Sequence, residues 1–190
     1  QIETLAGESI AGKNILSINS DEWSWHEIEH GSMSSEERIR LRLIRKAGKF
    51  DVYMVILAAG RWDMIRLGQS LEIPAISFFH AGYSDISNGS VILRKDTDPD
   101  SVIFYGPELP LQKGQYRVRM SFTSDSAPGT ELGECFIGSG RLSSYPVKAV
   151  AGQEAVEFKF VQSENLQVRF NFRFYRNGNI TIRNVTFSAI

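Results

Sequence analysis

The chain has 190 residues, of which 42% are hydrophobic, with a formal net charge of -1 and a single cysteine. This length and apolar content suit one large globular domain, or one domain with a smaller partner. The near-zero charge gives no general attraction to nucleic acid or to anionic membranes. The longest apolar run, residues 52–59, is far too short to cross a bilayer. We therefore expect neither a nucleic-acid partner nor membrane insertion.

The single cysteine cannot form an internal disulfide. Together with a first stretch that shows no signal-peptide pattern, it favours a cytoplasmic location. Cys135 itself lies in a strand-like alternation of apolar and polar residues, and no local signature supplies a histidine partner. We interpret it as a buried packing thiol and not as a nucleophile.

Two tryptophans stand out in the first part of the chain. Trp23 and Trp25 occupy alternate positions beside acidic residues and histidines. Indole faces bind the apolar face of a pyranose, so both are candidate sugar-binding residues; the alternative is that they are buried anchors on one strand face. His26 and His30 have the spacing of two metal ligands on a helix, but the Trp-Ser-Trp alternation argues against a helix there.

Residues 34–57 are compatible with two structures. As a helix, the segment would begin at a Ser-x-x-Glu capping box and end at a glycine. As a hairpin, the alternating residues 38–43 would pair with residues 50–57. We favour the hairpin, because Arg40 would fall inside the apolar stripe of the helix.

A longer strand and two loops follow. Residues 71–79 are predicted to form one strand, in which Pro74 belongs at an edge or a bulge because proline cannot donate a ladder hydrogen bond. Residues 82–90 are predicted to be a loop, and Tyr83 in this loop is a candidate ligand-binding aromatic.

The second loop carries three alternate carboxylates, Asp96, Asp98 and Asp100. Oxygen ligands at this spacing can wrap a hard cation, and calcium is the natural candidate. The pattern departs from the helix-loop-helix calcium loop, since Ser101 stands where glycine is required and no glutamate closes the loop. The alternative is a solvated acidic turn.

The second half of the chain is a series of alternating segments: residues 116–122, 156–160, 166–174 and 180–182. Apolar side chains at every second position place one face of a sheet in the core and the other in water. The pattern predicts an all-β protein, an antiparallel β-sandwich.

Two local signals refine the last strands. The Asn-Gly pair at 177–178 predicts a hairpin joining them. The apolar residues change parity between Ile182 and Val185, and a bulge near Arg183 would return both to the core face.

The Tyr-Gly-Pro at 105–107, the Gly-x-Tyr-x-Val at 114–118 and the closing Ile-x-Ile-x-x-Val-x-Phe at 180–187 resemble galactose-binding-like jelly rolls. The pattern is most similar to carbohydrate-binding modules attached to bacterial polysaccharide-biosynthesis and glycoside-processing proteins. The resemblance covers about residues 80–190. It implies sugar binding by loops at one end of the sandwich or by an exposed sheet face, and it carries over no catalytic residue. The resemblance leaves out residues 1–79. We expect this region to be β-rich or a short α/β unit, and to belong either to the same sandwich or to a truncated neighbouring domain.

Polar residues that alternate with the apolar ones are the remaining candidate ligand-binding residues. They are Arg117, Arg119, Arg169, Asn171, Arg173 and Arg183. If their strands are neighbours, they share one outer surface suited to carboxylates, phosphates and acidic sugars. The alternative is that the arginines only keep the sheet soluble.

Three functions are consistent with these patterns. The leading hypothesis is a non-catalytic module that binds a glycan or polysaccharide. The first alternative is a structural or assembly domain that makes protein contacts. The second is a fragment of a glycan-processing enzyme with a carboxylate pair among Glu22, Glu27, Asp96 and Asp98.

Overall fold

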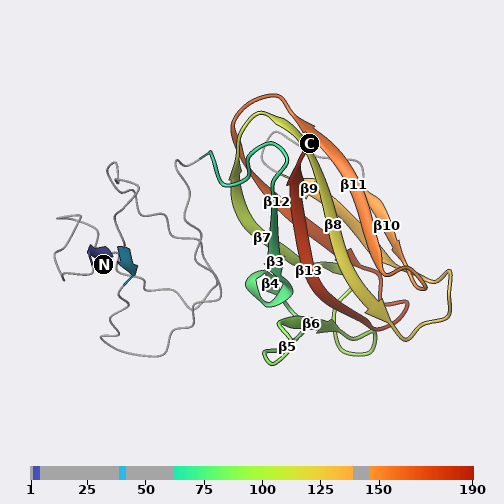
Figure 1. Cartoon of the computed structure of the whole chain (residues 1–190). Helices are drawn as coiled ribbons and strands as arrows, with labels where there is room; N and C mark the ends of the chain where they lie inside the picture. The colour runs from blue at the N-terminus through green and yellow to red at the C-terminus, as the bar shows by residue number, and fades with distance from the viewer. Residues whose placement is uncertain (1, 5–38, 42–61, 139–145) are drawn as a thin grey trace. The chain divides into compact units, whose positions relative to one another are not determined.

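The computed structural model describes residues 2–4, 39–41, 62–138 and 146–190 (Figure 1). The chain divides into two compact units, Gln1–Val52 and Tyr53–Ile190.

In the first unit, the described residues form two short antiparallel strands, β1 (Ile2–Thr4) and β2 (Ile39–Leu41). A strand at β2 agrees with the hairpin interpretation of that part of the sequence, but its partner is β1. The expected partner, residues 50–57, lies outside the described residues, as do Trp23, Trp25 and the acidic and histidine residues near them.

The second unit is an antiparallel β-sandwich, as the alternating segments predict (Figure 1). The five-stranded sheet has, in spatial order, β10 (Val147–Val150), β9 (Glu131–Gly138), β12 (Leu166–Phe174), β7 (Ser101–Leu111) and β4 (Phe79–His80). The six-stranded sheet has β11 (Ala155–Gln162), β8 (Gly114–Ser124), β13 (Ile180–Ala189), β6 (Ser90–Leu93) and β5 (Tyr83–Asp85), with β3 (Ser70–Pro74) also paired to β13. From β7 to β13 the chain passes between the sheets at every connection except that from β9 to β10, in keeping with the jelly-roll type expected from the resemblance. No described segment is an apolar helix long enough to span a bilayer.

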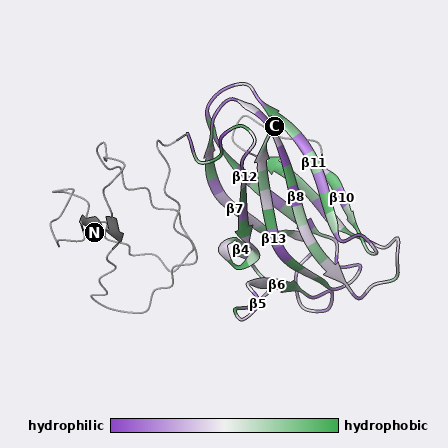
Figure 2. Ribbon diagram, viewed as in Figure 1, coloured by the Kyte–Doolittle hydropathy of each residue, from purple (hydrophilic) through white to green (hydrophobic). Residues whose placement is uncertain are grey.

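The core lies between the two sheets and is rich in phenylalanine. Phe78 and Phe104 stack with ring centroids 4.7 Å apart, and Phe170 meets both edge-on, at 6.0 and 6.2 Å. All three side chains are fully buried. Hydrophobic and hydrophilic residues alternate along the strands in Figure 2, so each sheet has one dry and one wet face.

The bulge expected in the last strand is present. The pairing of β13 with β8 shifts register between Ile182 and Asn184. Val185 and Phe187 are fully buried as a result, although they differ in parity from Ile182.

The Asn-Gly hairpin prediction is wrong. β12 and β13 lie in different sheets, so the connection between them crosses the end of the sandwich. Arg176 adopts a positive φ of 60°, and Asn177 Nδ2 donates to the Glu131 carbonyl oxygen over 2.8 Å. Gly178 is required by close approach and not by a turn type, because a Cβ at this position would overlap the Ser126 hydroxyl oxygen.

We expect Gly178→Ala to destabilise the sandwich by about 1–3 kcal/mol, the usual cost of forcing extra volume into a packed site. The measurement is chemical denaturation followed by far-UV circular dichroism. The double variant Gly178→Ala with Ser126→Gly should recover most of the loss, because it removes the overlapping hydroxyl. If the double variant were no more stable than Gly178→Ala, the overlap would not be the cause.

The single strand predicted over residues 71–79 is also wrong. A 3-10 turn at Ala75–Ser77 breaks the segment and sends β3 and β4 into different sheets. Pro74 ends β3, whose described partner is β13 on one side, in agreement with the expected edge position. The sandwich thus begins at β3, ahead of the boundary at residue 80 expected from the resemblance.

Candidate functional site

The polar residues expected on one outer surface are divided between two. Arg117 and Arg119 on β8 and Arg183 on β13 belong to the six-stranded sheet. Arg169, Asn171 and Arg173 lie on β12, in the five-stranded sheet. The outer faces of two packed sheets point in opposite directions, so the expectation of a single shared surface is wrong.

The arginines of the six-stranded sheet are engaged with this sheet itself. Arg117 Nε lies 3.4 Å from Glu157 Oε1 on β11. Arg119 Nη1 donates to Ser121 Oγ, and Arg183 Nη2 donates to the Phe122 carbonyl oxygen, each over 3.3 Å. These contacts fit the alternative interpretation, in which the arginines stabilise and solubilise a sheet face.

The outer face of the five-stranded sheet carries a row of residues paired across four strands. Phe79 on β4 is in register with Tyr105 on β7, Tyr105 with Asn171 on β12, and Asn171 with Phe136 on β9. Neighbouring strands are about 4.8 Å apart, so this row is about 14 Å long. We call the row, together with Arg169 and Val102 beside it, the Tyr105 surface.

A three-layer stack occupies one half of the Tyr105 surface. The Phe79 and Tyr105 ring centroids are 4.6 Å apart at an interplanar angle of 30°. The Arg169 guanidinium carbon lies 5.3 Å from the Tyr105 ring centroid, a cation–π distance. Phe79 ends the stack on the edge strand β4 and is 36% exposed. The stack therefore holds the rings in place and still leaves apolar surface in water.

A hollow of about 220 Å³ opens beside this stack. It is lined by Val102, Tyr105, Arg169 and Asn171. The Asn171 side chain is only 2% exposed, and its Nδ2 donates to the Arg169 carbonyl oxygen over 3.1 Å. The hollow combines an aromatic ring, a guanidinium and a fixed amide, which are the groups that small polar ligands with apolar faces require.

Charged residues at the far end of the same face pair with one another. Arg173 Nε lies 3.8 Å from Asp100 Oδ1, and its guanidinium carbon is 6.0 Å from the Tyr175 ring centroid. Burial, followed by a hydrogen bond to Glu134, raises the pKa of Tyr175 to about 12. These contacts leave Arg173 less available to a ligand than Arg169.

A larger hollow, of about 560 Å³, lies on the six-stranded sheet and includes Arg94 and Asp96 in its lining. Its polar groups hold loops together: Ser124 Oγ donates to the Asn179 carbonyl oxygen, and Asn179 Nδ2 donates to Asp125 Oδ2, over 2.7 and 2.9 Å. No aromatic side chain is among its described lining residues. This hollow is therefore the weaker candidate for stacking a ligand.

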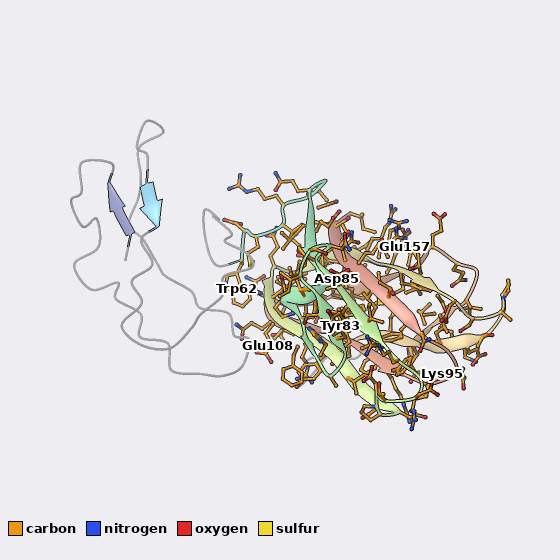
Figure 3. The ribbon with its side chains drawn as sticks, turned by 90° about the horizontal axis from the view of Figure 1, so that it is seen from below. Trp62, Tyr83, Asp85, Lys95, Glu108 and Glu157 are labelled. Carbon is orange, nitrogen blue, oxygen red and sulfur yellow. The ribbon has the colours of Figure 1, made fainter. Side chains whose placement is uncertain are left out.

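Tyr83, labelled in Figure 3, is 57% exposed on β5. The Arg94 guanidinium carbon lies 5.2 Å from the Tyr83 ring centroid. Tyr83 is in the six-stranded sheet and so does not join the Tyr105 surface.

The three carboxylates of the acidic loop have different surroundings. Asp98 Oδ2 accepts the Arg94 backbone N–H over 2.6 Å, which closes the loop on itself. Asp100 pairs with Arg173, and Asp96 lines the larger hollow. The described residues contain no group of three or more histidine, cysteine, aspartate or glutamate side chains placed to hold a metal ion. Calcium binding thus stays a prediction from sequence.

Cys135 on β9 is fully buried, with its Sγ 3.9 Å from Met120 Sδ. Burial, followed by the negative charge of Glu134, raises the pKa of the thiol well above its ordinary value. The predicted burial of the Cys135 thiol is therefore confirmed.

We expect Cys135 to resist a thiol-exchange reagent in the native protein at neutral pH, because the reactive thiolate is both disfavoured and inaccessible. One thiol per chain should react once denaturant unfolds the sandwich. Rapid reaction without denaturant would contradict this burial.

Three aromatic residues of the Tyr105 surface were not among the sequence candidates: Phe79, Tyr105 and Phe136. Their signal was weak because each lies on a different strand. Tyr105 belongs to the Tyr-Gly-Pro motif, and Phe136 alternates with the buried Cys135 and Ile137, which places it on the outer face.

No protein-family profile matches the chain, and no curated protein sequence matches it. Among solved structures, the chain is similar to the C-terminal CBM6, a carbohydrate-binding module, of LamC, a marine laminarinase from Zobellia galactanivorans; identity is 13%, the TM-score is 0.45, and 63% of this chain and 99% of that chain are covered. The ligand-free CBM1 of BiXyn10A is 18% identical with a TM-score of 0.42, covering 63% of this chain and 97% of that one. The insecticidal crystal protein Cry7Ca1 of Bacillus thuringiensis is 13% identical with a TM-score of 0.40, covering 66% and 23%. These sequence identities and TM-scores are low. We therefore assign the fold from the strand pairing within this chain, and the candidate site from the geometry of this chain's own residues.

Proposed function

We propose that the chain is a non-catalytic glycan-binding module whose ligand binds at the Tyr105 surface. The observation that carries the proposal is the combination of a held aromatic stack with a guanidinium and a buried amide around one hollow. A pyranose ring has an apolar face that packs on aromatic carbon and a rim of hydroxyls that needs both donors and acceptors.

Each side chain has a distinct role in this proposal. Tyr105, held in the stack with Phe79 and Arg169, lines the hollow, and Phe79 offers exposed aromatic surface at the sheet edge. Arg169 donates hydrogen bonds to sugar oxygens, and the Asn171 amide fixes the floor. Because the row crosses four strands, an oligosaccharide would run across the strands and not along them.

Binding without turnover is favoured by the lining of the hollow. Glycoside hydrolysis typically uses two carboxyl groups that flank the scissile bond. The described lining has no carboxylate: it consists of one aliphatic, one aromatic, one guanidinium and one amide side chain.

The test is an array of immobilised neutral and acidic glycans probed with the full chain, followed by calorimetric titration of the oligosaccharides that bind. We expect saturable binding to at least one glycan class. Failure of the full chain to bind any glycan on the array would overturn the proposal.

A further inference from the structure

We propose that Glu108 restricts the Tyr105 surface to neutral glycans and excludes glycans that carry a carboxylate. This inference rests on the function proposed above and names the ligand class of the same site. It differs from the expectation of acidic sugars that the arginines suggest from sequence alone.

The first argument is the charge balance of the outer face of the five-stranded sheet. Two of its cations already have carboxylate partners: Arg173 pairs with Asp100, and Lys148 Nζ lies 2.6 Å from Glu131 Oε1. Among the described residues of this face, Arg169 is therefore the cation that remains available to a ligand. One available guanidinium is a weak basis for recognising a polyanion, which needs several.

The second argument is the position of Glu108. Glu108 on β7 is the direct cross-strand partner of Arg169 on β12. Side chains opposite each other in an antiparallel pair have Cβ atoms about 5 Å apart and lie on the same face. Glu108 is exposed, and Figure 3 shows it extending outward from the sandwich.

The two charges do not form an ion pair in the described structure, because the Arg169 guanidinium lies over the Tyr105 ring instead. A ligand carboxylate that approached Arg169 would therefore also approach Glu108, whose negative charge offsets the attraction. A sugar hydroxyl meets no such conflict. It can accept from Arg169 and donate to Glu108, and this matches the donor and acceptor capacity of a hydroxyl group.

The test compares glycans of equal length that differ only at C6, namely neutral galacto-, gluco- and manno-oligosaccharides against their uronate counterparts. The full-length protein and its Glu108→Gln variant are titrated with both series at low and at moderate salt. Glu157→Gln is the matched control, because Glu157 is also an exposed strand glutamate but lies in the six-stranded sheet (Figure 3).

We expect wild type and Glu157→Gln to bind a neutral series at least about 10-fold more tightly than its uronate counterpart. Glu108→Gln should tighten uronate binding by about 10-fold at low salt, and added salt should weaken this gain, because it is electrostatic. Affinity for the neutral series should fall by about 3-fold, since the glutamine oxygen is an uncharged and weaker acceptor for the sugar hydroxyl, so the two series should shift in opposite directions.

Two results overturn the inference and leave the proposed function intact: equal affinity of wild type for uronate and neutral series, or an unchanged ratio in Glu108→Gln. Binding of neither series by any variant overturns both proposals together. The control is the thermal unfolding temperature of Glu108→Gln. If it equals that of wild type, a change in affinity does not come from a loss of fold.

Discussion

Replacing Tyr105 with alanine is expected to weaken glycan binding by at least about 30-fold, the effect of losing a central aromatic contact worth about 2 kcal/mol. Tyr105 lines the hollow, stacks on Phe79 and lies under the Arg169 guanidinium. Its removal would therefore delete one wall of the site and release two other side chains from their fixed positions. The measurement is calorimetric titration with the tightest oligosaccharide found on the array.

The matched control is Tyr83→Ala. Tyr83 is also a strand tyrosine under an arginine, but it is more exposed than the half-buried Tyr105 and lies in the six-stranded sheet. Its removal should change glycan affinity by less than about 3-fold, because it does not belong to the proposed site. A large loss with Tyr83→Ala and none with Tyr105→Ala would move the binding site to the other sheet.

The second large effect concerns the core. Phe170→Ala should lower the free energy of unfolding by about 3–5 kcal/mol, because a buried phenylalanine leaves a cavity that its neighbours cannot fill. Phe170 is fully buried and meets the rings of Phe78 and Phe104 edge-on. Since Phe78 precedes β4 and Phe104 lies on β7, the cavity would form directly beneath the Tyr105 surface.

Chemical denaturation measures this loss, with Phe79→Ala as its control. Phe79 is the next residue in sequence to Phe78, but its side chain is on the outer face and 36% exposed. Its removal should cost about 1 kcal/mol or less in stability, while it still weakens glycan binding. Equal losses of stability from the two variants would contradict the assignment of Phe170 to the core and Phe79 to the surface.

Alternation in sequence separates inner from outer residues along the long strands of the second half of the chain. Phe170 and Arg169 are neighbours in sequence, and the first is buried while the second is exposed, as period two requires. The same argument anticipated the bulge in β13, since only an extra residue reconciles the parity of Ile182 with that of Val185.

Alternation does not predict which strands are neighbours. Arg117 and Arg169 have the same pattern in sequence, yet they lie on opposite outer faces of the sandwich. Sheet membership is decided by packing between distant segments, which no local pattern records. The Asn-Gly prediction failed for a related reason: the contact of Gly178 with Ser126 is set by the arrangement of two sheets and not by the turn itself.

The candidate site was only partly accessible from sequence. Arg169 and Asn171 were identified because they interrupt an apolar strand with polar groups. Phe79 could not be identified, because the turn at Ala75–Ser77 breaks the alternation ahead of it; Phe136 could be placed on the outer face by its alternation with Cys135, but not beside Tyr105. Their alignment with Tyr105 depends on the register of three strand pairs.

The most direct measurement of the central claim is an NMR titration of the isotopically labelled full chain with a mixture of neutral oligosaccharides, followed by assignment of the backbone amides that shift. We expect the largest shifts on the four strands that carry the Tyr105 surface, β4, β7, β12 and β9, at Phe79, Tyr105, Asn171 and Phe136. Shifts confined to the six-stranded sheet, or no shifts at saturating oligosaccharide, would contradict a glycan site on this face.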